Sequence, residues 1–69
     1  MAISETKKVL ISGLKLILSN NDVILAIALL LKSEDQMLTM LDYIVKHRQE
    51  NPSEDEVIQV AQKISEQIS

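Results

Sequence analysis

Nine consecutive apolar residues occupy positions 23–31, between Asp22 and Lys32, in a chain of only 69 residues. A helix formed by this segment has no polar face, so other elements must enclose it on all sides. Leaving three of its large aliphatic side chains in water would forfeit about 5 to 9 kcal/mol, at roughly 1.5 to 3 kcal/mol each. The whole stability expected of such a chain is ~3.5 to 10 kcal/mol, from roughly 0.05 to 0.15 kcal/mol per residue. The segment must therefore be buried by the rest of the chain or by a second molecule.

The composition favours an all-α fold. Gly13 and Pro52 are the single glycine and the single proline, too few backbone breakers for a series of hairpins and tight turns. A chain of this length forms one domain, here residues 1–69, that buries only about 60% of the surface of the unfolded chain. We therefore predict a single small helical bundle of three to four helices.

Caps and apolar periodicity place these helices at about residues 4–19, 22–32, 33–50 and 53–68. The third and fourth helices begin with the same pattern, a serine followed by two acidic residues, Ser33-Glu34-Asp35 and Ser53-Glu54-Asp55. Serine is a preferred N-cap, and acidic residues are favoured in the first turn by the helix dipole. Asn51 and Pro52 end the third helix, and Asp22 is the predicted cap of the second.

Two structural questions stay open at this point. The segment 22–50 contains no glycine and no proline, so the two middle helices are either separate or one continuous helix. Gly13 lies in the middle of the first helix, where it costs about 1 kcal/mol relative to alanine. Such a cost is more easily tolerated where the backbone of another helix passes close.

The chemistry of the side chains predicts no enzyme. The chain has no cysteine and one histidine, His47, which excludes thiolate ligands and histidine clusters. Asp42 and His47 are five residues apart and face different sides of a helix. One glycine cannot form a glycine-rich phosphate-binding loop. We expect no catalytic residue, no cofactor and no metal.

Neither a membrane span nor export is expected. A span from residue 9 to residue 31 would place Lys15 and the polar residues 19–22 inside the bilayer. The chain has no cysteine, and its first residues do not form a convincing signal peptide. Both observations favour a cytoplasmic location.

Binding is the function that remains, and we predict a protein-protein interaction or regulatory module that forms a homodimer. Twofold dimers are the commonest assemblies that cover an apolar surface with the same surface of a second copy. The candidate interface combines aliphatic residues with the single aromatic residue, whose type suits the centre of an interface. The interface candidates are Leu14, Ile24, Ile27, Leu31, Met37, Met40 and Tyr43.

The alternative is a small nucleic-acid-associated regulator of transcription. Residues 1–32 carry a net charge of +2 and residues 33–69 a net charge of −5. A modest basic patch could form from Lys7, Lys8 and Lys15, or from Lys46 with Arg48 across a dimer. Backbone contacts to nucleic acid need clustered Lys and Arg, which makes nucleic acid the less favoured partner for a chain of net charge −3. A third hypothesis is peripheral membrane association through the first helix.

Overall fold

Four helices and one short 3-10 helix make up residues 5–67, the part of the chain that the computed structural model describes. The prediction of an all-α bundle is confirmed, and residues 5–67 contain no strand. The outer ends of the first and last predicted helices, at residues 4 and 68, lie outside the described residues. The elements are α1 (Glu5–Ile17), α2 (Asn21–Leu30), α3 (Glu34–His47), η1 (Arg48–Glu50) and α4 (Glu54–Glu66).

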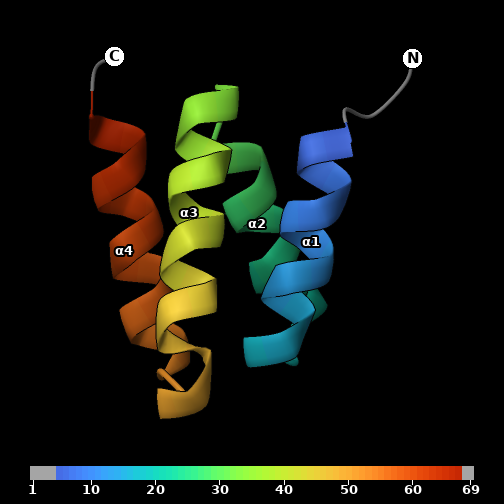
Figure 1. Ribbon diagram of the computed structural model, residues 1–69, viewed down its shortest axis with the longest axis vertical. Helices are drawn as coiled ribbons and strands as arrows, with labels where there is room; N and C mark the ends of the chain where they lie inside the picture. The colour runs from blue at the N-terminus through green and yellow to red at the C-terminus, as the bar shows by residue number, and fades with distance from the viewer. Residues whose placement is uncertain (1–4, 68–69) are drawn as a thin grey trace.

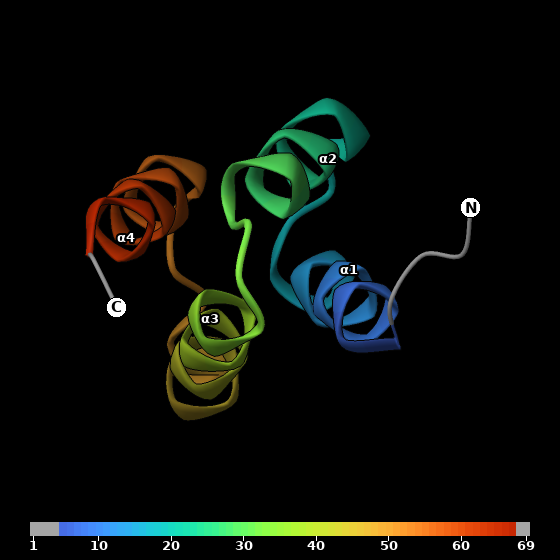
Figure 2. The same cartoon turned by 90° about the horizontal axis from the view of Figure 1, so that it is seen from above.

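The helices form a square in cross-section, in the order α1, α2, α4, α3 around its edge (Figure 2). α2 and α3 lie at opposite corners although they are consecutive in the chain. α1 and α4 occupy the other two corners. α1 and α3 run in the same direction, and α2 and α4 run in the opposite one (Figure 1). The starts of α1 and α3 are joined by a hydrogen bond in which Thr6 Oγ1 donates to Glu34 Oε1 over 3.1 Å.

The two middle helices are separate. α2 ends at Leu30, Leu31 has extended backbone angles, and Ser33 caps the start of α3. The Ser33 hydroxyl oxygen accepts from the amide of Gln36 at 3.2 Å, and Ser53 makes the equivalent bond to the amide of Glu56 at 3.2 Å. Both predicted serine caps are confirmed, and the hypothesis of one continuous helix over 22–50 is wrong.

Two other predicted helix ends need correction. The N-cap of α2 is Asn20, whose side-chain oxygen accepts from the amide of Asp22 at 3.0 Å. Asp22 therefore lies in the first turn of α2, two residues after the cap. The third helix is α-helical only to His47 and continues as η1, after which Asn51 adopts a left-handed conformation with φ of 50°.

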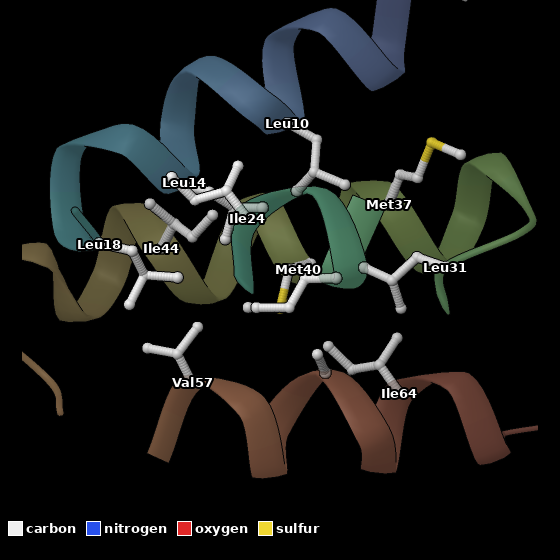
Figure 3. Close-up of a cluster of buried hydrophobic side chains, with 12 residues drawn as sticks. Leu10, Leu14, Leu18, Ile24, Leu31, Met37, Met40, Ile44, Val57 and Ile64 are labelled. Atoms are coloured by element: carbon white, nitrogen blue, oxygen red, sulfur yellow. The ribbon is translucent and has the colours of Figure 1, made fainter. Parts of the chain in front are cut away.

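The core is aliphatic, and each helix supplies three side chains to it, counting Leu18 and Leu31 just beyond α1 and α2 (Figure 3). Their spacing of three, four or seven residues is that of one helix face. The core residues are Leu10, Leu14, Leu18, Ile24, Ile27, Leu31, Met37, Met40, Ile44, Val57, Ala61 and Ile64.

Gly13 lies where α1 packs against α3. A Cβ atom at this position would lie 3.2 Å from Leu41 Cδ2 and 3.6 Å from Ile44 Cδ1. The nearest neighbours of Gly13 are thus side chains of α3, and not the helix backbone whose close approach was expected there. The nearer atom is the end of a flexible, only partly buried leucine, which can move by a few tenths of an ångström.

We therefore expect Gly13→Ala to raise the free energy of unfolding by up to about 1 kcal/mol, the gain in helix propensity. Urea unfolding followed by circular dichroism measures the change. Gly13→Val is the matched control, because its branched side chain overpacks against Leu41 and Ile44 and should destabilise the fold. A loss of stability in the alanine variant would show that Leu41 cannot move.

Candidate interaction surface

Six of the seven predicted interface residues lie inside the fold of one chain. Each is at most 6% exposed and belongs to the aliphatic core. They come from three helices and pack against one another in the core, so a contact between two folded copies would be made mainly by other residues. Ile27 also lines a groove on the surface. The six are Leu14, Ile24, Ile27, Leu31, Met37 and Met40.

Tyr43 is the one predicted interface residue that is partly exposed. Its ring lies next to the ring of His47, with 4.6 Å between the centroids and 33° between the planes. Partial burial, followed by the negative charges of Glu56 and Glu50, raises the pKa of the Tyr43 hydroxyl above its usual value of 10.0. The phenol is therefore neutral at physiological pH and can donate a hydrogen bond at the boundary of α3 and α4.

The apolar segment 23–31 is only half enclosed. Its buried residues, Ile24, Ile27, Ala28 and Leu31, follow one helix face. The opposite face leaves Leu25 51% and Leu29 69% exposed, with Leu30 37% exposed beside them. Exposing these large aliphatic side chains to water forfeits the free energy that their burial would provide.

An apolar groove adjoins this face, between α2 and α4, with a volume of about 220 Å³. For comparison, an engineered apolar cavity of about 150 Å³ holds benzene, so the groove has room for an aliphatic side chain. Ala26 lines the groove and is three residues, or one turn, from Leu29 on the same side of α2. Leu25 lies one turn before Leu29, which makes the exposed leucines and the groove continuous. We name the whole region the α2 surface, formed by Leu25 and Leu29 with the lining residues Val23, Ala26, Ile27, Leu30, Ile58 and Gln62.

The exposed half of this surface has a signal in the sequence. Once one face of a helix is assigned to the core by its i, i+3, i+4, i+7 spacing, the remaining residues of the segment must face outward. The contribution of Ile58 and Gln62 could not be predicted from helical spacing, because the packing of α4 beside α2 depends on the tertiary fold.

The α2 surface is almost entirely apolar. Gln62 is the one polar residue among those that line the groove, and no cluster of three or more metal-binding side chains occurs within residues 5–67. None of the described helices is both long enough and apolar enough to traverse a lipid bilayer. Comparisons of the chain with protein-family models, curated proteins and solved structures find no match.

Proposed function

We propose that this chain is a protein-interaction module that acts by binding, without a catalytic step, and that a partner protein docks on the α2 surface. The observation that carries the proposal is the continuity of the exposed leucines of α2 with the apolar groove beside them. An exposed aliphatic surface next to a hollow is typical of a protein-binding site.

The shape of the groove favours one kind of partner, an amphipathic helix. The groove lies between the parallel helices α2 and α4 (Figures 1 and 2), and Val23, Ile27 and Leu30 line one wall at successive turns. A helix laid along such a groove inserts aliphatic side chains spaced by three or four residues. Small-molecule sites, in contrast, combine an enclosed pocket with several converging polar groups.

A charge on the exposed part of the α2 surface tests the proposal. Leu29 is 69% exposed, so Leu29→Glu is expected to leave the stability within about 0.5 kcal/mol of the wild type. It should weaken partner binding by tenfold or more, equivalent to about 1.4 kcal/mol or more, because the partner's apolar side chains would then meet a carboxylate. Thr39→Glu is the matched control, an added charge at an exposed position on α3, at the corner opposite α2.

The measurement starts with affinity capture from native lysate by the wild type and the two variants, and continues with the purified partner. A helical segment of that partner should bind the wild type and Thr39→Glu equally in calorimetry, and should shift the amide resonances of the α2 surface. Equal binding of the partner by Leu29→Glu, or capture of the same proteins by all three chains, would contradict the proposal.

A further inference from the structure

A second apolar surface lies across the contact between α1 and α3, on the side of the square opposite the α2 surface (Figure 2). Gly13 of α1 faces Leu41 of α3 at the centre of this contact. Two side chains of each helix, three or four residues before and after these central positions, flank the contact on its solvent side. We name these four, which are 53% to 75% exposed, the α1–α3 patch: Val9 and Leu16 of α1, and Leu38 and Val45 of α3.

The two helices are in register across the patch. The bond between Thr6 and Glu34 and the contact between Gly13 and Leu41 each join residues 28 positions apart. A residue of α1 is therefore level with the residue 28 positions later in α3. Each apolar side chain of α1 in the patch thus lies within one residue, or ~1.5 Å along the axis, of an apolar side chain of α3.

Charged residues continue this arrangement at the two edges. Lys8 and Lys15 lie on α1, on the side of the patch away from α3, and Asp35 and Asp42 lie on α3, on the side away from α1. Both pairs repeat every seven residues, and each lysine is level with an aspartate to within one residue. Asp42 also makes an exposed ion pair with Lys46, with 3.0 Å between Nζ and Oδ2. The patch therefore has a basic edge and an acidic edge of matching spacing.

We infer that the α1–α3 patch binds a second copy of this chain in a twofold dimer whose axis runs parallel to α1 and α3. This axis lays α1 of one copy on α3 of the other at the same height. Val9 then meets the partner's Leu38, Leu16 meets the partner's Val45, and the basic edge meets the partner's acidic edge. An axis perpendicular to the helices would instead place α1 on α1, with lysines facing lysines, an arrangement that repulsion between like charges disfavours.

The dimer uses a different side of the bundle from the proposed binding function. The two α2 surfaces stay uncovered and face away from each other, so one dimer presents two docking sites. Loss of the dimer and loss of partner binding are therefore separate observations.

Exchange of the charges at the two edges tests the inferred geometry. One variant carries Lys8→Glu with Lys15→Glu, and the other carries Asp35→Lys with Asp42→Lys. Alone, each variant places like charges on both edges, and its dimer dissociation constant should rise about tenfold or more. Mixed in equal amounts, the two variants complement each other on both edges and should form a dimer again. Light scattering over a concentration series gives the masses, and circular dichroism verifies the fold of these exposed-site variants.

Lys63→Glu is the control, a charge reversal on α4 outside the patch, and it should leave the dimer unchanged. Leu38→Glu with Val45→Glu should abolish the dimer at low and high salt, whereas the effect of the charge variants should shrink as salt screens the edges. A wild type that stays monomeric at its highest soluble concentration would overturn the inference. So would a dimer that tolerates all patch variants, or two charge variants that stay monomeric when mixed.

Discussion

Leu31→Ala is expected to lower the free energy of unfolding by about 3 to 5 kcal/mol, whereas Leu29→Ala, two residues earlier, should change it by no more than about 0.5 kcal/mol. Both leucines belong to the same run of apolar residues, but Leu31 is fully buried and Leu29 is 69% exposed. Figure 3 shows Leu31 between Met37 of α3 and Ile64 of α4. Truncation there removes a fully buried side chain and leaves a cavity in the core.

The expected loss from Leu31→Ala is a large part of the ~3.5 to 10 kcal/mol expected for a chain of this length, at roughly 0.05 to 0.15 kcal/mol per residue. Urea denaturation followed by circular dichroism would show an earlier midpoint, or a chain that is already partly unfolded in buffer. Equal effects at the two positions would contradict the assignment of the faces of α2. Because Leu31 is buried, a charge at this position would unfold the chain and cannot test partner binding.

The helices could be predicted from local signals. The side chains of Ser33 and Ser53 each accept a hydrogen bond from the amide three residues later. This contact lies within one helix turn and does not depend on the rest of the fold, so it can be predicted from the sequence. The break between α2 and α3 was harder to predict, because the Ser33 cap competes with a segment, 22–50, that contains no glycine and no proline. The structure favours the cap, which satisfies an amide at the start of α3.

The candidate interface could not be predicted from the sequence, because large apolar residues follow the same helical spacing in a core and at an interface. Met37 and Met40 follow the spacing of a buried stripe, and nothing local shows whether the neighbour is the same chain or another. The uninterrupted apolar run predicted full enclosure of residues 23–31, whereas the structure encloses one face and leaves Leu25 and Leu29 exposed. The other three helices, each of 13 or 14 residues, pack around one face of α2 and cannot also cover its outer side.

Gln36 is the residue whose importance depends most on the tertiary fold. Its side-chain oxygen accepts from the amide of Lys32 at 3.1 Å, and its side-chain nitrogen donates to the carbonyl oxygens of Ser65 and Gln67, each at 3.3 Å. It thus joins the loop before α3 to the C-terminal end of α4, where helix carbonyl groups lack partners within the helix. From the sequence alone, Gln36 is only the third residue of a helix, the counterpart of Glu56 in α4.

Gln36→Ala should lower the free energy of unfolding by about 1 to 3 kcal/mol, because it removes hydrogen bonds from groups that are partly buried. Gln36→Glu separates two explanations of this loss. If Gln36 only caps α3, glutamate serves equally well at the third position of the helix, and the stability stays at the wild-type value. If Gln36 holds the end of α4, glutamate fails, because its carboxylate cannot donate and lies against carbonyl oxygens at the negative end of the α4 dipole. We expect the second result at neutral pH, measured by urea unfolding and by faster amide exchange in the last turn of α4. The carbonyl groups would also raise the pKa of the new carboxyl in the folded state, so the deficit of Gln36→Glu relative to the wild type should shrink as the pH falls and the protonated acid becomes a donor.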